Sequence, residues 1–294
     1  MKQKKNLEGK QSNLKLVFLF CLFIGLLIVG SIMFKGIFLV MKSKFDVSHR
    51  FTIVVETPNP KINGKTLTIY SYAPDTKDIS ILHFAGKTSI SGTTIGRYLG
   101  IPIDAQIVFN RPAGERQAIE NFFSDSQNSP DGVIARAFFN FYDLKTSLTE
   151  IDLFRLFLFS KSIPSHAITE KEIPIDAKGR LPDDLTIDKI VAPLFIDASL
   201  AEEKMSIQIV NGADAAGLAN RLGRVLTNMG ANVVAVSTSD SIVPKSVIQY
   251  VGDKSYTVER LTKTLGIPAQ EVQKTGISDI IIKLGKDNAN PKSF

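Results

Sequence analysis

Three aspartates in the first half of the chain could lie near one another in the folded protein. Asp75 and Asp78 are three positions apart, and Asp104 follows a short apolar segment. Paired carboxylates can hold a divalent cation or move protons in a reaction. Aspartates are also common in turns and helix caps, where the side chain bonds to nearby backbone groups. Turn and capping roles are the simpler interpretation of all three.

The histidines and the cysteine show no pattern typical of a metal or nucleophile site. His49, His83 and His166 are widely scattered, and the single cysteine, Cys21, lies in an apolar stretch. No pair has the spacing of zinc ligands, and neither G-x-S-x-G nor H-E-x-x-H occurs. The sequence therefore predicts no metal ligand, no cofactor and no disulfide. The lack of N-x-S/T sites and of further thiols weakly favours a bacterial source.

A glycine-containing loop follows an alternating apolar segment near residue 210. It contains Asn211, Gly212 and Gly217, and it precedes a helical pattern. Backbone amides at such a position can bind phosphate. The loop lacks the Gly-Lys-Ser/Thr of a P-loop and the G-x-G-x-x-G of a dinucleotide site. The next two strands are also expected to form a hairpin, so we interpret these three residues as a turn motif.

The elements that position these residues begin with an uncharged apolar run, Leu16–Phe34. About 20 such residues span a bilayer as a helix. A signal peptide has a shorter apolar region and a small-residue cleavage site, and a soluble core helix is rarely so uniformly apolar. We therefore predict a basic tail at 1–15 and a transmembrane helix at 16–40. Because the tail has five lysines and one acid, we expect a cytoplasmic N-terminus and extracytoplasmic domains.

The distribution of charge argues against nucleic acid as a partner. The chain carries +6 overall, but residues 1–50 hold nine Lys or Arg and two acids, a net of +7. The other 244 residues therefore carry a net −1. A basic stripe that could follow a phosphate backbone is not expected there, which leaves the lipid bilayer as the predicted partner of the basic end.

Residues 46–162 are predicted to form a mixed α/β domain. Residues rich in β-branched and aromatic side chains predict strands, and apolar residues at helical spacing predict helices further on. The expected strands are 51–57, 66–72, 79–84 and 103–109, the first two antiparallel; a short helix is expected at 93–99, and 113–162 is expected to be helical. The proline-containing stretch 163–204 is interpreted as a connector that partly packs on its neighbours.

Residues 205–287 are predicted to form a second, smaller domain, followed by a tail at 288–294. The expected order is strand 206–210, helix 216–229, strands 232–237 and 246–251, helix 257–265 and strand 279–284. This βαββαβ order is typical of a ferredoxin-like, four-stranded antiparallel sheet with two helices on one face. The predicted fold class is therefore α+β, preceded by one transmembrane helix.

The second domain resembles the LytR C-terminal domain of the LytR–CpsA–Psr cell-envelope proteins. The resemblance rests on three stretches: Ile207-Gln-Ile-Val-Asn-Gly212, Gly217-Leu-Ala219, and the closing Asp279-Ile-Ile-Ile-Lys-Leu-Gly285-Lys-Asp287. It covers about 80 residues. It implies an extracytoplasmic protein of the cell envelope.

Residues 46–162 resemble a reduced version of the catalytic domain of the same family. The matching stretches are Phe51-Thr-Ile-Val-Val, Leu67-Thr-Ile-Tyr-Ser-Tyr-Ala-Pro-Asp75-Thr76, Leu99-Gly-Ile-Pro-Ile-Asp104 and Ser147-Leu-Thr-Glu-Ile-Asp-Leu. Active members transfer polyprenyl-pyrophosphate-linked glycopolymers to the wall, with arginines for the pyrophosphate and acids for a metal. The family's Pro-Arg-Asp stands here as Ala73-Pro74-Asp75, and Phe51 replaces an expected acid. Proline cannot make the bidentate phosphate contact of arginine.

Three hypotheses follow from this resemblance. The first is a non-catalytic envelope protein that binds wall polymer, peptidoglycan or glycopolymer, or another envelope protein. The second is a divergent phosphotransferase, which would need Mg²⁺ and would use Asp75, Asp104 and Arg97. No motif places the other arginines that could substitute, Arg111, Arg116 and Arg136. The third is an interaction module without affinity for carbohydrate.

Overall fold

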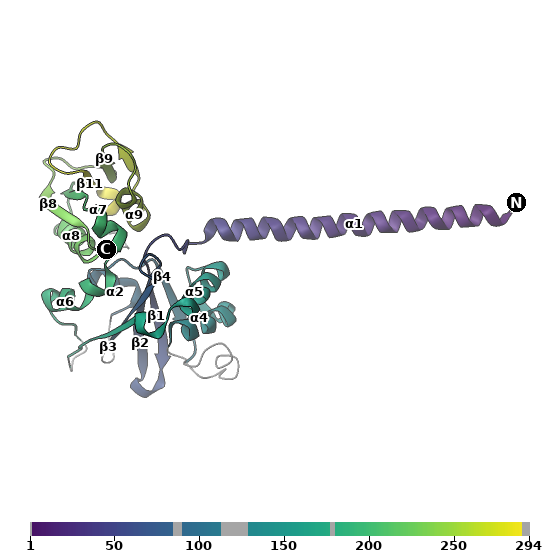
Figure 1. The fold of residues 1–294 in the computed structure, drawn as a ribbon, viewed down its shortest axis with the longest axis horizontal. Helices are drawn as coiled ribbons and strands as arrows, with labels where there is room; N and C mark the ends of the chain where they lie inside the picture. The colour runs from purple at the N-terminus through teal and green to yellow at the C-terminus, as the bar shows by residue number, and fades with distance from the viewer. Residues whose placement is uncertain (1, 85–89, 113–128, 177–179, 290–294) are drawn as a thin grey trace. The chain divides into compact units, whose positions relative to one another are not determined.

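The computed structural model describes residues 2–84, 90–112, 129–176 and 180–289, and the chain divides into two compact units, Met1–Ser43 and Lys44–Phe294. The first unit is a single helix, α1 (Lys2–Lys42), drawn in purple in Figure 1. Its segment Val17–Lys42 has a mean hydropathy of 2.8, and none of it is buried. By length and composition this segment could cross a membrane, in agreement with the apolar span predicted at 16–40.

The second unit begins with a six-stranded sheet. Its spatial order is β5-β4-β1-β2-β3-β6. The strands are β1 (Phe51–Asn59), β2 (Gly64–Ala73), β3 (Asp78–Phe84), β4 (Ala105–Phe109), β5 (Leu144–Thr146) and β6 (Ile168–Ile173). As predicted, β1 and β2 are antiparallel, and they are joined through a 3-10 turn at Pro60–Ile62. The parallel pairs β1/β4 and β3/β6 make the sheet mixed.

Helices cover both faces of this sheet (Figure 1). On one face, α4 (Pro130–Phe139) and α5 (Glu150–Ser162) bury a core that includes Phe45, Tyr72 and Phe159. On the other face, α2 (Gly92–Leu99) and α6 (Asp184–Phe195) pack on β1, β2 and β3. Strands with apolar side chains on both faces are expected when helices cover both sides of a sheet. The sheet is therefore the middle layer of three.

The expectation that residues 113–162 are helical is confirmed only in part. Residues 113–128 lie outside the described part of the chain, and a 3-10 turn (Phe141–Asp143) and strand β5 separate α4 from α5. Thr149 is the N-cap of helix α5 and forms a capping box with Asp152. Such a box satisfies amides that the first turn of a helix leaves unpaired.

The stretch 163–204, predicted as a connector that partly packs on its neighbours, does pack on the first sheet, but its described residues form regular elements rather than a connector alone. They supply strand β6, helix α6 and helix α7 (Ala198–Glu203). Strand β6 extends the first sheet beside β3, and α6 buries Ile187, Val191, Leu194 and Phe195 on it. The prolines suggested a loop, but Pro193 is accommodated inside α6. Apolar burial against the sheet outweighs the local cost of this proline.

The C-terminal domain has a five-stranded sheet in the order β10-β9-β11-β7-β8. Its elements are β7 (Ser206–Asn211), α8 (Leu218–Asn228), β8 (Asn232–Thr238), β9 (Val247–Tyr250), α9 (Tyr256–Leu265), β10 (Ala269–Glu271) and β11 (Ile280–Leu284). Both helices share one hydrophobic core with the sheet. The predicted elements are present, with β10 in addition.

The predicted ferredoxin-like antiparallel sheet is wrong. Strand β7 pairs in parallel with β8 and also with β11, and β8 and β9 lie apart in the sheet rather than forming a hairpin. A parallel neighbour requires a crossover, which α8 provides. The short β10 adds a parallel edge to β9. The order of elements alone did not distinguish these arrangements, because pairing is decided by contacts that are remote in sequence.

Candidate functional site

The three aspartates singled out in the sequence lie at one end of the six-stranded sheet. Asp78 begins β3 opposite Ala73, the last residue of β2. Asp104 directly precedes β4, and its backbone N–H donates to the carbonyl of Thr52 at the start of β1. Asp75 lies in the turn between β2 and β3. The strand register therefore brings the predicted acids to the same edge of the domain.

These acids nevertheless have separate partners. The Oδ2 of Asp104 accepts from the backbone N–H of Thr52 at 2.7 Å, and Asp78 pairs with Arg50 at 3.2 Å. Asp75 is exposed and accepts from the N–H of Thr76. Within the described residues, no group of three or more His, Cys, Asp or Glu side chains could hold a metal ion. The carboxylates at this edge therefore accept hydrogen bonds from backbone N–H groups or pair with single arginines.

Arg50, which the sequence analysis did not identify, is the buried arginine of this edge. Its Nη1 donates to the carbonyl of Leu194 in α6 at 2.9 Å and to Ser71 Oγ at 3.2 Å, and its Nη2 donates to Asp78. These bonds tie β1, β2, β3 and α6 together. Both terminal nitrogens of Arg50 are therefore bonded to protein groups, while its buried Nε has no hydrogen-bond partner among the described residues.

The arginines named in the sequence analysis that the structure describes have different surroundings from one another. Arg97 is exposed on α2, and Arg111 pairs with Asp143 at 3.0 Å. Arg136 is buried: its Nη2 donates to the carbonyl of Arg111, and its guanidinium lies 3.9 Å from the centre of the Phe109 ring. Arg116 lies outside the described residues.

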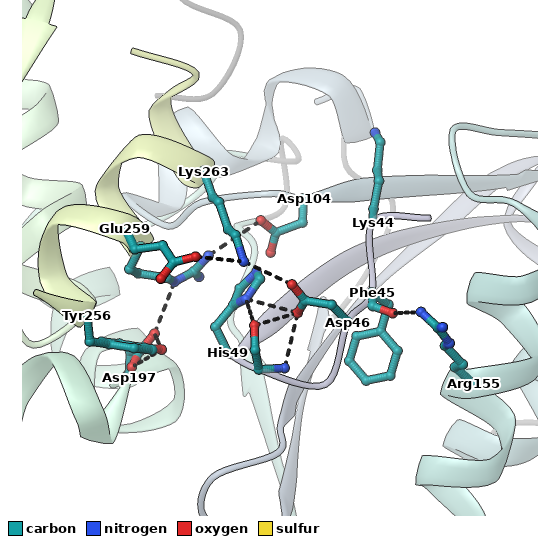
Figure 2. Close-up of polar contacts among 12 residues, drawn as sticks. Lys44, Phe45, Asp46, His49, Asp104, Arg155, Asp197, Tyr256, Glu259 and Lys263 are labelled. Carbon is teal, nitrogen blue, oxygen red and sulfur yellow. Dashed lines mark hydrogen bonds and ion pairs between the residues drawn. The ribbon is translucent and has the colours of Figure 1, made fainter. Parts of the chain in front are cut away.

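A second buried arginine reaches the same edge from the C-terminal domain. Arg260 of α9 is 2% exposed, and its Nε donates to Oδ2 of Asp197 at 3.0 Å. Asp197, the N-cap of α7, is 1% exposed and also accepts from the hydroxyl of Tyr256 and the N–H of Leu200. The Nη1 of Arg260 forms a 3.9 Å ion pair with Asp104. Figure 2 shows Asp197 and Asp104 reached by dashed lines from this region of α9.

The chain segment that follows α1 completes the cluster. Asp46 pairs with Lys263 of α9 at 2.9 Å, and Ser48 Oγ donates to Asp46 at 2.6 Å (Figure 2). The ring of His49 is buried and lies 2.8 Å from Ser48 Oγ. Residues far apart in sequence thus surround a cavity of about 360 Å³, which is lined by Asp46, Ser48, His49, Tyr256, Glu259, Arg260 and Lys263. We call these seven residues the junction pocket.

The environment shifts the pKa values of two groups in the junction pocket. Burial opposes ionisation of Asp46, but hydrogen bonds from Ser48 and Lys263 outweigh it, so the pKa of Asp46 lies below its usual range. Burial and the nearby charge of Arg260 lower the pKa of His49, against the opposing influence of Asp46 and Asp104. At neutral pH, Asp46 is therefore ionised and His49 is neutral.

We expect His49 to make stability depend on pH below about 6.5, the usual pKa of an unfolded histidine. Its pKa is lower in the folded state, so the folded protein binds fewer protons there. The stability this provides is present above the unfolded pKa and is lost as the pH falls through the folded pKa. Chemical denaturation at pH 7.5, 6.5 and 5.5 should show this loss in the wild type and less of it in His49→Gln. The control His166→Gln should keep the pH dependence of the unfolding free energy seen in the wild type. If His49→Gln kept it as well, His49 would not be its source.

Sequence analysis missed Arg260, although one signal for it exists. Within the predicted helix, Arg260 follows Thr257 by three residues and precedes Leu261, so helical periodicity places it beside the apolar face. Thr257 and Leu261 are both buried in the structure. A charged residue on the buried side of a helix requires a partner, but its partners, Asp197 and Asp104, are more than 60 and 150 residues away.

Hydrogen bonds from the Asn211 side chain and from the backbone of Gly212 hold the turn motif of the C-terminal domain in place. Asn211 Nδ2 donates to the carbonyl of Ala215, and Asn211 Oδ1 accepts from the N–H of Ala213. The N–H of Gly212 donates to Leu284, and its carbonyl accepts from Val243. Gly217 has a φ of +72° and forms the N-cap of α8. The expected hairpin was one reason to reject a phosphate loop here, and that reason is wrong. The packed, internally bonded loop itself supports a structural role.

Replacing Gly212 by alanine is expected to destabilise the C-terminal domain by about 1–3 kcal/mol, the usual range for overpacking. A Cβ at this position would lie 2.5 Å from Cγ2 and 2.8 Å from Cβ of Val243. Chemical denaturation, followed by a probe in this domain, measures the loss. The double variant Gly212→Ala/Val243→Ala should recover part of it, because the closest contact, with Cγ2 of Val243, is then removed while the contact with Cβ remains. A wild-type midpoint for Gly212→Ala would show that the loop adapts.

A family comparison agrees with the resemblance found in the sequence of the C-terminal domain. Residues 204–287 match the LytR_C family, described as LytR cell envelope-related transcriptional attenuator. No curated protein matches the sequence of the chain.

Several solved structures are similar over part of the chain. The transcriptional regulator YvhJ from Bacillus subtilis is 14% identical, with 48% of this chain and 94% of that chain covered and a TM-score of 0.32. B. subtilis TagV is 13% identical, with 48% and 94% covered and a TM-score of 0.30. The transcriptional regulator EF0465 from Enterococcus faecalis is 10% identical, with 65% and 91% covered and a TM-score of 0.33. Likeness at this level carries no argument about residues 44–203. The family match alone is decisive, and it shows that residues 204–287 form a LytR C-terminal domain.

Proposed function

We propose that this protein is anchored in the cell membrane by α1 and that its folded unit lies outside the membrane, where it binds wall polymer without catalysis. The description of the LytR C-terminal family as cell envelope-related supports the location. The apolar segment Val17–Lys42 supports the anchor. The lysines at Lys2, Lys4, Lys5, Lys10 and Lys15 support a cytoplasmic N-terminus.

The main support for a non-catalytic role is the state of the acidic edge of the first domain. Transfer of a pyrophosphate-linked polymer requires cations that are free to bind phosphate oxygens. Among the described residues, Arg50 and Arg260 reach this edge, and both are buried and bonded to protein groups. The position at which the family resemblance implies a phosphate-binding arginine holds Pro74. Charges at this edge thus stabilise the fold and join it to the C-terminal domain.

The direct test is retention of the full chain on isolated cell wall. The detergent-solubilised protein is mixed with purified Gram-positive sacculi, before and after acid removal of wall glycopolymers, and sedimented. We expect retention on at least one of the two preparations and none on cellulose, the control polymer. Absence from both pellets would contradict wall binding and favour an envelope protein as the partner.

The same preparation tests the non-catalytic part of the proposal. The full chain with Mg²⁺ is given a polyprenyl-pyrophosphate-linked oligosaccharide and wall acceptor, and polyprenyl phosphate release is followed by mass spectrometry. We expect no release above a protein-free control. Release that disappears in Asp75→Asn or Arg97→Gln would establish the divergent phosphotransferase instead, with Asp75, Asp104 and Arg97 as its candidate residues.

A further inference from the structure

The junction pocket has the size and position of a ligand site. Its volume of about 360 Å³ falls within the range of small-molecule sites, roughly 300–1,000 Å³, and such sites often lie between domains. Asp46, Ser48 and His49 form one wall, directly after α1, and four residues of α9 form the other. Figure 2 shows Lys263 and His49 beside Asp46, with Tyr256 and Glu259 on the helix opposite.

One buried polar atom in this pocket has no hydrogen-bond partner. The Nη1 of Arg260 is inaccessible to solvent and donates to no acceptor among the described residues. Its ion pair with Asp104 spans 3.9 Å, longer than a hydrogen bond. A buried donor without an acceptor is energetically costly. This donor faces Asp104 and is covered by the protein, so a ligand in the pocket is held by the other polar groups that line it.

The charges around the pocket disfavour an anion as the ligand. Asp46 and Glu259 line it together with Lys263 and Arg260, and both cations already pair with carboxylates. Asp104 and Asp197 stand behind Arg260 and add two further negative charges. Phosphate or a polyanionic polymer would face uncompensated acids and pay a desolvation cost without a free cation. The ligand that fits is uncharged.

The remaining chemistry of the pocket matches a polyhydroxylated molecule. Lys263 and Arg260 carry N–H donors, and Asp46 and Glu259 carry acceptors. Hydroxyl and acetamido groups both donate and accept hydrogen bonds, so either kind of protein group could bind them. Tyr256 adds an aromatic ring, and its hydroxyl is fixed by Asp197 at 3.0 Å. A ring held in this way offers an apolar surface for the C–H face of a sugar.

We propose that the junction pocket binds an uncharged sugar unit of the wall glycan. This inference rests on the proposed function and identifies the site and the ligand class for it. The residues that take part are Lys263 and Arg260 as donors, Asp46 and Glu259 as acceptors, and Tyr256 as the stacking surface. Because its two walls come from the segment after α1 and from α9, the bound sugar also contacts both parts of the unit.

The test measures binding of a neutral N-acetylglucosamine trimer to the full chain in detergent by isothermal titration calorimetry. Lys263→Met removes one charged donor, a change worth roughly 1.5–3 kcal/mol, so affinity should fall about tenfold or more. Ser48→Trp places a large side chain at the exposed rim and should abolish binding. Lys274→Met is the matched control: Lys274 is exposed and does not line the pocket, so its affinity should equal that of the wild type.

The outcomes separate this inference from the proposed function. Trimer binding that is lost in Ser48→Trp and weakened in Lys263→Met, with unchanged circular dichroism, supports the junction pocket. Equal binding by both pocket variants and the control would overturn it, as would no trimer binding by a wild type that still sediments with sacculi. In those two cases the wall-binding function stands. Pyrophosphate binding that competes with the trimer would overturn the uncharged ligand class.

Discussion

Replacing Arg260 by methionine is expected to lower the free energy of unfolding of the Lys44–Phe294 unit by about 3–5 kcal/mol, the range for breaking a buried ion pair. Asp197, 1% exposed, would keep its ionised carboxylate in a buried site, with Tyr256 and Leu200 as its remaining donors among the described residues. Asp104 would lose its contact with the C-terminal domain as well. Guanidinium denaturation, followed by circular dichroism, measures the change.

The double variant Asp197→Asn/Arg260→Met distinguishes the ion pair from simple loss of packing. Removing both charges relieves the burial cost of the lone carboxylate, so the double variant should be more stable than Arg260→Met alone. Lys254→Met, an exposed lysine just before α9, should change stability by no more than about 0.5 kcal/mol. If the single and double variants were equally destabilised, the pair would not be energetically coupled.

Replacing Asp152 by alanine is expected to cost about 3 kcal/mol or more, because hydrogen bonds to charged groups contribute roughly 1.5–3 kcal/mol each. The Asp152 side chain is fully buried. Its Oδ1 accepts from the N–H groups of Lys44 and Phe45, and its Oδ2 accepts from the N–H and hydroxyl of Thr149. One carboxylate thus caps α5 and fixes the chain just after α1.

Hydrogen exchange measures the local effect of Asp152→Ala, in addition to its effect on global stability. Protection of the Lys44 and Phe45 amides should fall strongly, since both lose their acceptor. Glu150→Ala, in the same first turn of α5, should cost no more than about 0.3–1 kcal/mol through the helix dipole and should leave these amides protected. Unchanged protection in Asp152→Ala would show that the burial of Phe45 alone holds this segment.

Much of the local structure could be predicted because its causes are local. The alternating apolar residues of β1 and β2 and the turn between them are close in sequence, and so is the capping box of Thr149 and Asp152. Helices α8 and α9 follow from apolar spacing. Gly230 and Gly266, both at positive φ, lie just after these helices, where glycine commonly ends a helix. Periodicity and capping act within a few residues, so sequence alone expresses them.

The arrangement of these elements could not be predicted in the same way. The βαββαβ order suggested an antiparallel sheet, whereas β7 lies between two parallel neighbours, β8 and β11. Residues 163–204 were predicted to be a connector that partly packs on its neighbours, because prolines interrupt their sequence pattern. In the structure, β6 and α6 complete the first domain. In both cases the free energy comes from apolar surfaces that meet only after the chain has folded.

The sequence by itself determined an apolar helix long enough for a membrane, a near-neutral remainder and the LytR C-terminal pattern, because each depends on composition or short-range spacing. It also named Asp104. Only the tertiary structure decided what Asp104 does: strand register sets it against Thr52, and α9 brings Arg260 to it across 156 positions of sequence. Such ion pairs have no periodic signature, because they depend on which buried surfaces pack together rather than on local spacing.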